Sequence, residues 1–163
     1  MILHAGLIAR LDPGGWRGVL IEGASGTGKS DLALRAIDRG WVLVADDRTL
    51  VWVCEGRLYG RAAPALAGLI EARGVGVVTA PRRLFAPIDL VACCRAGETI
   101  ERMPEFQTSN RLGVAIPRID LPAREASAPV KLDHALSHLG LRPQPAYQAS
   151  RAGPPLSAAG GDP

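Results

Sequence analysis

The stretch Gly23-Ala24-Ser25-Gly26-Thr27-Gly28-Lys29-Ser30 fits the pattern G-x-x-x-x-G-K-[ST] of a phosphate-binding loop. The apolar residues 19–21 before it predict a buried strand, and the residues after it repeat apolar positions at helical spacing as far as Gly40. A phosphate-binding loop lies between a strand and a helix, because its backbone N–H groups and the helix N-terminus together bind phosphate oxygens. We therefore expect all of these loop residues to bind a nucleoside triphosphate within an α/β fold.

Lysine usage supports the same interpretation of the loop. Lys29 and Lys131 are the only lysines in a chain with 19 basic residues, so arginine supplies nearly all of the positive charge. In a phosphate-binding loop the lysine binds the β- and γ-phosphates as a flexible point charge, and the serine hydroxyl binds the Mg²⁺ that bridges them. Chance is the alternative in a chain with 19 glycines, but the flanking strand and helix patterns argue against it. We expect Lys29 to neutralise phosphate charge and Ser30 to hold Mg²⁺.

Length, composition and charge exclude several classes of protein. A chain of 163 residues fits one domain with its own core. The net charge of +3 is spread along the chain without clustered aromatic residues, which argues against a nucleic-acid interface. No apolar run approaches the roughly 20 residues that span a bilayer, and no secretory signal is apparent. We expect a cytoplasmic protein without membrane contact, whose Cys54, Cys93 and Cys94 are reduced and mostly buried.

Local patterns predict a mixed sheet. Turn residues at positions 12–15 separate two apolar runs, and Glu55-Gly56 separates two more, so each pair of runs should form an antiparallel hairpin. Strands are expected at residues 2–8, 19–21, 41–45, 49–54, 57–59, 74–78 and 88–93, and helices after the glycine-rich loop, at 64–70 and at 130–139. We expect residues 1–141 to form one domain. Residues 142–163 are rich in Pro, Gly, Ala and Ser, a composition typical of a disordered tail.

Asp46 and Asp47 end the expected strand at residues 41–45, and they follow Ser30 by 16 and 17 residues. Carboxylates at the end of such a strand lie at the ligand-binding edge of an α/β sheet. One of them could hold Mg²⁺ while the other accepts the proton of an incoming hydroxyl. The alternative is a solvated turn residue beside a capping residue. We favour the functional interpretation, because the glycine-rich loop and a buried strand precede the pair.

Three further groups of polar residues allow a functional and a structural interpretation. His4 lies in an apolar strand pattern, where a histidine is more often a hydrogen-bonded core residue than a catalyst. Glu71 and Arg73, beside a glycine-rich strand, could form a surface ion pair, or act as a Mg²⁺ ligand and a phosphate clamp. His134 and His138 share one outward-directed helical face, and no third ligand is apparent, so we do not expect a metal site there.

Several of these segments, taken in order, resemble the catalytic domain of HPr kinase/phosphorylase, a bacterial enzyme that phosphorylates a serine of the phosphocarrier protein HPr. The resemblance rests on His4, on the loop continuing as Asp31-Leu32-Ala33-Leu34, on residues 43–47, on Glu71-Ala72-Arg73-Gly74-Val75-Gly76, and on residues 116–124. The segment from Glu71 resembles the family's signature sequence, and residues 116–124 resemble a segment that ends in a catalytic arginine. The resemblance implies a phosphate-loop fold like that of phosphoenolpyruvate carboxykinase, with a mixed sheet and flanking helices.

The same resemblance implies a role for each matched residue. It identifies Ser30 and Glu71 as Mg²⁺ ligands, Asp47 as the proton acceptor for the substrate serine, and Asp46 as a support for the metal or that base. It identifies His4 as the active-site histidine, Lys29 and Arg73 as phosphate-binding cations, and Arg124 as the catalytic arginine. It further implies ATP and Mg²⁺ as cofactors, an HPr-type phosphocarrier as the protein substrate, and a homohexamer.

Some features depart from the family pattern. The chain starts at the catalytic domain, which resembles the short form of alphaproteobacteria, whereas the long form has an additional N-terminal domain. The sequence after Val78 differs from the family's usual continuation, and residues 135–139 replace a basic helical segment tied to the reverse reaction. We therefore expect serine kinase activity first, with phosphorolytic dephosphorylation as an additional activity that this segment does not support. A small-molecule kinase or NTPase with the same loop, and a nucleotide-dependent regulator that transfers no phosphate, stay as alternatives.

Overall fold

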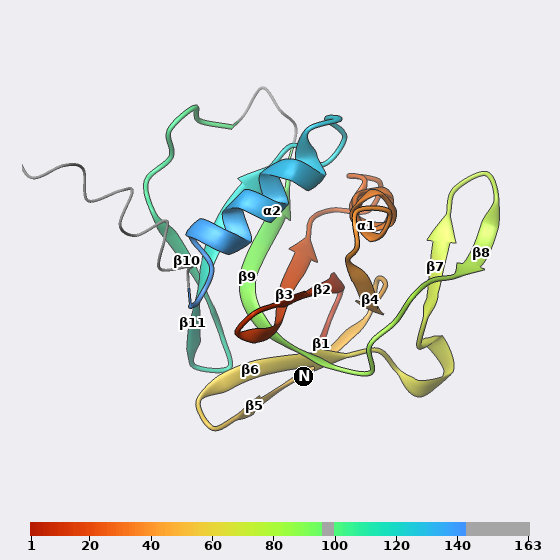
Figure 1. The fold of residues 1–163 in the computed structure, drawn as a ribbon, viewed down its shortest axis with the longest axis horizontal. Helices are drawn as coiled ribbons and strands as arrows, with labels where there is room; N and C mark the ends of the chain where they lie inside the picture. The colour runs from red at the N-terminus through yellow and green to blue at the C-terminus, as the bar shows by residue number, and fades with distance from the viewer. Residues whose placement is uncertain (96–99, 143–163) are drawn as a thin grey trace, which may run out of the picture.

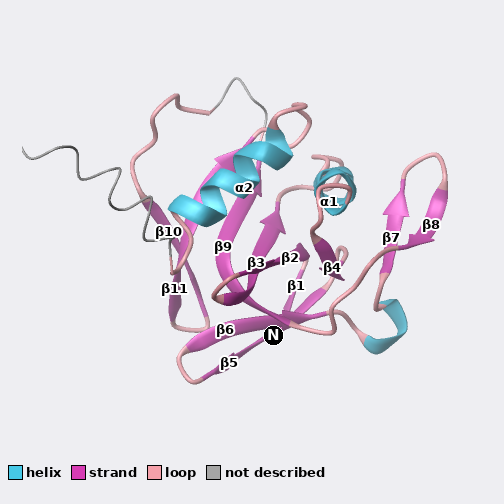
Figure 2. Cartoon of the chain, in the orientation of Figure 1, coloured by secondary structure: helices cyan, strands magenta, loops and turns pink. Residues whose placement is uncertain are grey.

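The computed structural model describes residues 1–95 and 100–142. It contains a large mixed sheet, with both helices packed against one of its faces, and a separate two-stranded sheet (Figures 1 and 2). The strands are β1 (Ile2–Leu3), β2 (Gly6–Asp12), β3 (Gly15–Glu22), β4 (Val42–Ala45), β5 (Thr49–Cys54), β6 (Arg57–Arg61), β7 (Leu69–Ala72), β8 (Gly76–Thr79), β9 (Ala86–Cys94), β10 (Gln107–Arg111) and β11 (Val114–Leu121). The helices are α1 (Lys29–Ile37) and α2 (Ala128–His138), with a short 3-10 helix at Pro64–Leu66.

Strand β9 joins the two parts of the large sheet. Its first residues, Ala86 and Pro87, pair antiparallel with β6, and the sheet continues from β6 to β5 and β1. Residues 88–94 pair in parallel with β3 on one side and β11 on the other. Strand β2 lies antiparallel between β3 and β4, and β10 pairs antiparallel with β11. The sheet is therefore mixed, as the sequence predicted, and it curls where β9 passes from one set of neighbours to the next.

Both hairpins predicted from turn residues are confirmed. Asp12 pairs with Gly15 where β2 and β3 meet, so the two residues between them form the connection. Glu55 and Gly56 connect β5 to β6 with φ angles of 49° and 71°. Positive φ at both positions of a two-residue connection matches the right-handed twist of the strands that it joins. These turns set the register of β2 with β3 and of β5 with β6.

Apolar side chains fill both faces of the large sheet. Leu7 and Ile8 are adjacent in β2 and fully buried, yet they belong to different clusters, because successive strand residues point to opposite faces. Ile8 packs in the cluster that contains Leu32 of α1 and Leu132 of α2. Leu7 packs on the other face in the cluster that contains Leu58 of β6. Burying one such side chain contributes about 1.5–3 kcal/mol. One cluster therefore holds the helices against the sheet, and the other holds the β5–β6 part of the curled sheet against the part that contains β2.

The prediction of a helix at residues 64–70 is wrong. The 3-10 helix ends at Leu66, and Gly68 has a φ of 81°, a left-handed conformation that interrupts helical backbone. Strand β7 follows, with Ile70 buried between the more exposed Leu69 and Glu71. This alternation has the period of a strand, and β7 pairs antiparallel with β8. A run of apolar residues this short did not distinguish a helix from a strand.

The single strand predicted at residues 2–8 is divided in the structure. Strand β1 pairs with β5, whereas β2 pairs with β3 and β4, so the chain crosses between two parts of the sheet. His4 lies in the bend between β1 and β2, not within a strand. Its side chain is 58% exposed, which contradicts the interpretation of His4 as a core residue.

Strands β10 and β11 form a hairpin that the sequence analysis did not predict. Leu112 and Gly113 connect the two strands with φ angles of 52° and 82°, a left-handed pair typical of tight hairpins. Strand β10 has the polar sequence Gln-Thr-Ser-Asn-Arg and pairs only with β11. An edge strand without an apolar face has no periodic signal by which it could be found.

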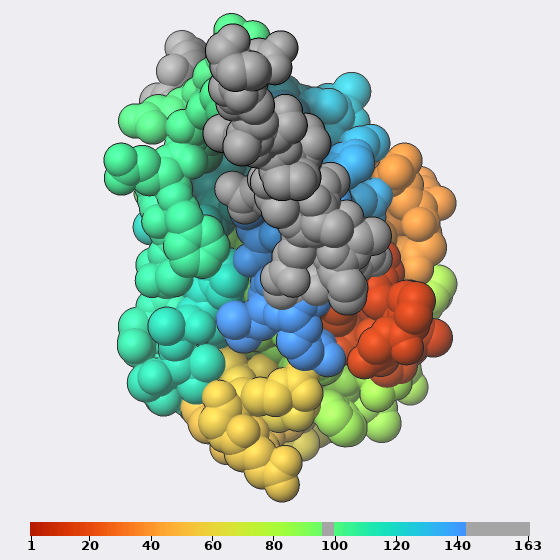
Figure 3. Space-filling view, turned by 60° about the vertical axis from the view of Figure 1, so that its left-hand side comes forward, coloured from red at the N-terminus to blue at the C-terminus, as the bar shows by residue number. Residues whose placement is uncertain are grey.

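The C-terminal end of the described chain is held by a buried carboxylate. Arg142 donates from Nη2 to Asp89 Oδ2 at 3.0 Å and to the Trp16 carbonyl at 3.2 Å. Asp89 is 1% exposed, and a carboxylate so buried requires charged partners. In Figure 3 the blue end of the described chain lies between the red β2–β3 hairpin and the yellow β5–β6 hairpin. The predicted tail, residues 142–163, lies outside the described residues apart from Arg142.

The sequence predicted no membrane-spanning segment and three mostly buried thiols. Neither helix in the described part of the chain is long and apolar enough to cross a membrane. All three cysteines are free thiols. Cys94 is buried and Cys93 half-buried, but Cys54 is exposed, because it ends β5 at the turn into β6.

Candidate active site

The glycine-rich loop leads from β3 into α1, and its backbone requires glycine at three positions. Gly23, Gly26 and Gly28 have φ angles of 149°, 80° and 98°, in the region that residues with side chains rarely adopt. A Cβ atom at Gly23 would also lie 2.9 Å from Thr27 Oγ1 and 3.0 Å from Cys94 Cβ. Helix α1 begins directly after Gly28, so its N-terminus lies against the same loop. The positive end of the helix dipole therefore favours an anion at this position.

Helix α1 ends where the sequence predicted. The Trp41 N–H donates to the Ala36 carbonyl at 3.2 Å, and the Gly40 N–H donates to the Ile37 carbonyl at 3.0 Å. These two bonds, with a φ of 92° at Gly40, form a Schellman motif that closes the helix. The buried face of α1 includes Leu32, so the helix that carries the loop is fixed both by packing and by its end.

Lys29 is the first residue of α1, and only 8% of it is exposed. Its Nζ atom donates to the carbonyl oxygens of Gly23 at 3.0 Å and of Ala24 at 3.3 Å. These two bonds hold the two ends of the loop together through one cation. A nearly buried ammonium group needs such acceptors, and neutral carbonyls are weaker partners for it than charged oxygens.

Asp46 connects three elements of the site. The Ser30 hydroxyl, in the first turn of α1, donates to Asp46 Oδ1 at 2.8 Å. The backbone N–H of Glu71, in β7, donates to Asp46 Oδ2 at 3.1 Å. Asp46 itself follows the last residue of β4. One carboxylate therefore fixes the Ser30 side chain and attaches β7, which does not pair with the large sheet, to the edge of that sheet.

Asp47 has an unusual backbone conformation that separates it from Asp46. Its φ angle is 58°, in the left-handed region that Asp tolerates better than most residues. Because of this turn, the two adjacent carboxylates have different partners. Asp47 Oδ1 lies 3.3 Å from Nε2 of His4, and both side chains are more than half exposed, at 54% and 58%.

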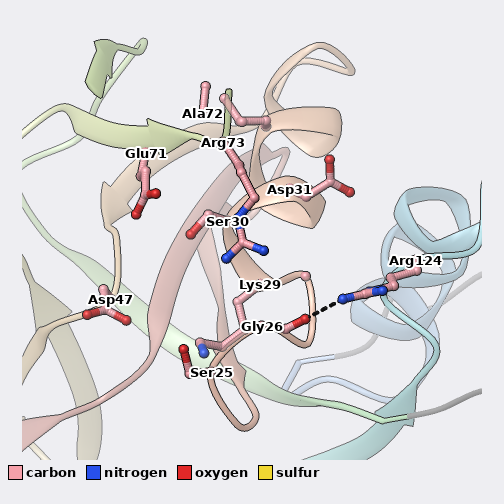
Figure 4. A pocket seen from close by; sticks show the side chains of 12 residues that line it. Ser25, Gly26, Lys29, Ser30, Asp31, Asp47, Glu71, Ala72, Arg73 and Arg124 are labelled. Atoms are coloured by element: carbon pink, nitrogen blue, oxygen red, sulfur yellow. Dashed lines mark hydrogen bonds between the residues drawn. The ribbon is translucent and has the colours of Figure 1, made fainter. Parts of the chain in front are cut away.

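A cavity of ≈ 430 Å³ lies between the glycine-rich loop, the first turn of α1, β7 and the turn that follows β11 (Figure 4). It is lined by Ser25, Gly26, Gly28, Lys29, Ser30, Asp31, Leu34, Asp47, Glu71, Ala72, Arg73 and Arg124. Lys29, Arg73 and Arg124 supply positive charge to this lining, while Asp31, Asp47 and Glu71 supply negative charge. Cations bind phosphate oxygens and carboxylates bind metal ions, so the cavity has the groups that a metal–polyphosphate ligand requires.

Glu71 and Arg73 both line this cavity. Figure 4 shows the Arg73 guanidinium pointing into the same space as Ser30 and Lys29, with the Glu71 carboxylate on the side of Asp47. Within residues 1–95 and 100–142, neither side chain forms a hydrogen bond or an ion pair. The surface ion pair considered from the sequence is therefore absent from this part of the chain, and both charged groups are available to a ligand.

Arg124 reaches the cavity from the opposite side. It lies in the turn between β11 and α2, and its Nη2 donates to the Gly26 carbonyl at 2.6 Å (Figure 4). A Cβ atom at Gly28 would lie 3.3 Å from Arg124 Cγ, so the glycine lets the arginine stem pack against the loop. The prediction had located a catalytic arginine here from sequence resemblance alone.

The predicted site residues are thus close together, although their roles stay predictions. The lining of the cavity includes Lys29, Asp47, Arg73 and Arg124. Asp46 is hydrogen-bonded to the lining residues Ser30 and Glu71. His4 is paired with the lining residue Asp47. The cavity is also lined by Asp31, Leu34 and Ala72, for which the sequence predicted no role. Helical spacing could have indicated Leu34, because it lies one turn after Ser30 on the same face of α1. His134 and His138, on α2, are not among the lining residues.

Comparison with known proteins gives the family. The family model described as HPr Serine kinase C-terminal domain matches residues 14–138. HPr kinase/phosphorylase of Streptococcus thermophilus (strain ATCC BAA-491 / LMD-9) is 40% identical over 119 residues, in an alignment that covers 66% of this chain and 38% of that protein. HPr kinase/phosphorylase of Clostridium tetani (strain Massachusetts / E88) is 35% identical over 119 residues, covering 70% of this chain and 39% of that protein. This chain spans about two fifths of the length of these curated relatives.

A solved structure agrees with the same conclusion. The Hpr(Ser) kinase/phosphatase from Coxiella burnetii superposes with a TM-score of 0.72 at 26% sequence identity. The match covers 83% of this chain and 93% of that chain. It confirms the mixed α/β class that was predicted from the sequence. The chain therefore belongs to the HPr serine kinase C-terminal domain family.

Proposed function

We propose that this chain is an ATP-dependent protein serine kinase that phosphorylates HPr or a related phosphocarrier. The proposal rests on one observation: three separate segments line the same cavity. They are the glycine-rich loop, Asp47, and the segment that carries Glu71 and Arg73. Family membership supports the same activity, because the relatives are named HPr kinase/phosphorylase. In this proposal the loop from Gly23 to Ser30 is a phosphate-binding loop in a fold like that of phosphoenolpyruvate carboxykinase.

The cations of the cavity would bind the phosphates of ATP. Lys29 would exchange the carbonyls of Gly23 and Ala24, at 3.0 and 3.3 Å, for β- and γ-phosphate oxygens. The exchange is favourable because a charged acceptor binds an ammonium group more strongly than a neutral one. Arg73 has no competing partner among the described residues, and it would steady the transferring phosphate. Arg124, beside Gly26, would stabilise charge that develops on the phosphate oxygens.

The residues of the cavity fit a Mg²⁺ ion. This ion prefers oxygen ligands, and proteins bind it through one or two carboxylates together with substrate phosphates and water. Ser30 Oγ, held by Asp46 at 2.8 Å, and the unpaired Glu71 carboxylate supply such oxygens. The described residues contain no group of three or more His, Cys, Asp and Glu that could hold a metal alone, so shared binding with phosphates is the arrangement that fits. Once bound, the ion neutralises charge on the phosphates.

Asp47 would act as the base for phosphate transfer. Its carboxylate accepts the proton of the substrate serine hydroxyl as the serine oxygen attacks the γ-phosphorus. The bond from the serine oxygen to phosphorus forms while the bond from that phosphorus to the β–γ bridging oxygen breaks, and ADP leaves. His4, at 3.3 Å, keeps the Asp47 carboxylate turned toward the cavity. Asp46 acts indirectly, because it orients Ser30 and attaches the strand that carries Glu71.

The same groups could catalyse the reverse reaction, in which phosphoserine is dephosphorylated by phosphorolysis. Inorganic phosphate would attack the phosphorus of phosphoserine, the serine oxygen would leave, and Asp47 would return a proton to it while pyrophosphate forms. We propose the kinase reaction as the main activity, because the chain lacks the basic segment at residues 135–139 that resemblance associates with the reverse reaction. We further propose a cytoplasmic location, one catalytic domain over residues 1–141, and a hexamer.

The decisive experiment is phosphate transfer from labelled ATP to purified HPr with Mg²⁺. The expected product is phosphoserine on HPr. Asp47→Asn should lower the transfer rate by about 10²–10⁴-fold, while nucleotide binding persists. Asp38→Asn, an exposed acid at the other end of α1, is the matched control and should transfer normally.

Three other outcomes would contradict the proposal. Near-normal transfer by Asp47→Asn would refute its role as the base. A phosphorylated metabolite in place of phosphoserine would identify a small-molecule kinase. Nucleotide and phosphocarrier binding without any turnover would identify a regulator.

A further inference from the structure

The turn that carries Arg124 is short and lies outside any strand or helix. It follows β11, and two bonds of its own shape it: the Glu125 N–H donates to the Pro122 carbonyl and the Ala128 N–H to the Glu125 carbonyl, both at 3.0 Å. The Arg124 side chain contributes one bond, to the Gly26 carbonyl. The Glu125 side chain accepts hydrogen bonds from Ser127 and Lys131, on the α2 side of the turn. A guanidinium that must meet a developing charge also needs its backbone held on the side of the glycine-rich loop.

Arg35, on α1, supplies the missing attachment. Its Nη1 atom donates to the Glu125 carbonyl at 2.9 Å, and its Nη2 atom donates to the Ala123 carbonyl. These carbonyls belong to the residues directly before and after Arg124. Because a guanidinium is planar and presents its donors as a rigid fork, the two bonds fix the peptide unit directly before Arg124 and the one directly after Glu125.

The ion pair of Arg35 with Asp31 orients the Arg35 guanidinium group. Its Nε atom donates to Asp31 Oδ2 at 2.9 Å, one helical turn earlier on α1. The Arg35 side chain is 29% exposed while that of Asp31 is 65% exposed, so the acid lies on the solvent side and the fork on the inner side. An exposed pair of this kind adds little to stability by itself. Its value here is orientation: Nη2 also lies 2.9 Å from Asp31 Oδ2, so Asp31 holds the Nε and Nη2 edge of the guanidinium while Nη1 and Nη2 donate to the carbonyls of the turn.

Packing also connects α1 to the turn that carries Arg124. Ala123 is 1% exposed and belongs to the cluster that contains Leu32 of α1. A Cβ atom at Gly28, at the start of the same helix, would lie 3.3 Å from Arg124 Cγ and 3.8 Å from Ala123 Cβ, so the turn lies close to the loop at this point. The glycine-rich loop, α1 and the turn at residues 122–125 are therefore attached to one another at three points. A nucleotide held by the loop would meet Arg124 in a fixed position.

We propose that Arg35 is a positioning residue for phosphate transfer, acting through Arg124. The inference rests on the proposed kinase function, and it predicts a further determinant of the rate that does not touch the nucleotide. Without the fork, Arg124 still lies near the loop but samples more positions. A misplacement of about 1 Å in a catalytic group can reduce a rate by about 10²-fold.

Steady-state kinetics of HPr phosphorylation test this role. Arg35→Met keeps the aliphatic stem but removes every donor, and it should lower kcat by about 10- to 100-fold with the KM for ATP changed less than about threefold. Arg35→Lys retains the charge without the fork and should recover little of the loss. Arg39→Met is the matched control, because Arg39 lies two residues after the end of α1 and binds Asp133 of α2 at 3.0 Å. It should keep the wild-type kcat.

A double-mutant cycle separates positioning from general damage. In an Arg124→Ala background, adding Arg35→Met should produce no further loss of kcat, because the group that Arg35 positions is already gone. A full additional loss in that background would overturn the proposal. So would a wild-type kcat in Arg35→Met, or rescue by Arg35→Lys.

Hydrogen exchange tests the attachment of the turn by Arg35 independently of any kinase activity. The amides of Glu125 and Ala128, which close the turn, should exchange faster in Arg35→Met than in wild type or Arg39→Met. If wild-type protein phosphorylates no HPr, the proposed function fails, and unchanged exchange at these amides would independently refute the attachment by Arg35. Faster exchange together with the loss of kcat supports the proposal.

Discussion

Asp46 should contribute to stability far more than the neighbouring Asp47, although the two are adjacent in sequence. Its carboxylate accepts bonds from the Ser30 hydroxyl at 2.8 Å and the Glu71 N–H at 3.1 Å. Hydrogen bonds to a charged group contribute about 1.5–3 kcal/mol each. Asp46 is half-buried, so water replaces part of this in a variant. We expect Asp46→Ala to lower the free energy of unfolding by about 2–3 kcal/mol, and the Tm by about 4–12 °C.

Two further variants make the measurement specific. Asp46→Asn keeps an oxygen for the Glu71 N–H, and the Ser30 hydroxyl can rotate to accept from the new amide, so its cost should stay below about 1 kcal/mol. Asp47→Asn removes one side of an exposed pair with His4 and retains a residue that tolerates a φ of 58°, so it should also cost less than about 1 kcal/mol.

Urea unfolding and thermal unfolding of the variants measure these differences. Hydrogen exchange in β7 and β8 locates them, because Asp46→Ala should loosen that hairpin before the rest of the sheet. The reasoning is refuted if Asp46→Ala unfolds at the wild-type urea concentration. It is equally refuted if Asp46→Asn proves as unstable as Asp46→Ala.

Three other outcomes follow from contacts in the fold. Gly60→Ala would set a Cβ atom 2.6 Å from Leu7 Cδ2, and this overpacking should lower the free energy of unfolding by about 1–3 kcal/mol in urea titrations. Burial raises the pKa of the Cys94 thiol to about 11, so at pH 8 Cys94 should react with a thiol reagent at least about a hundredfold more slowly than the exposed Cys54, as followed by mass spectrometry. Burial opposes ionisation of Asp120, but hydrogen bonds from two arginines outweigh it and hold its pKa below the usual value. Asp120→Asn should therefore be less stable than wild type at pH 7, and the difference should vanish as the pH falls below about 4, through the lowered pKa.

The parts of the fold that could be predicted from sequence are those with local signals. The turn at residues 12–15 and the Glu55-Gly56 turn marked both hairpins, and Gly40 marked the end of α1. The cavity was also predictable in outline, because the loop and Asp46-Asp47 both follow strands that end at one edge of the sheet. Local chemistry was enough in these cases because each signal acts within a few residues.

Other features depend on tertiary contacts that have no local signal. Among the described strands, the polar β10 pairs with β11 alone. Residues 64–70 become a short turn and a strand because Ile70, in β7, packs in the core cluster that contains Leu32 of α1. Arg35 illustrates the same limit within the site. From sequence it forms an ordinary pair with Asp31 at i,i+4, whereas its other acceptors are backbone carbonyls, which every residue has.

The β7–β8 hairpin contributes Glu71 and Arg73, although neither of its strands pairs with the large sheet. The turn at Gly74 and Val75 is exposed, so residues can be inserted or deleted there without shifting the register of another strand. A change in the length of this hairpin would therefore alter one wall of the cavity while the strand pairing of the large sheet stays intact.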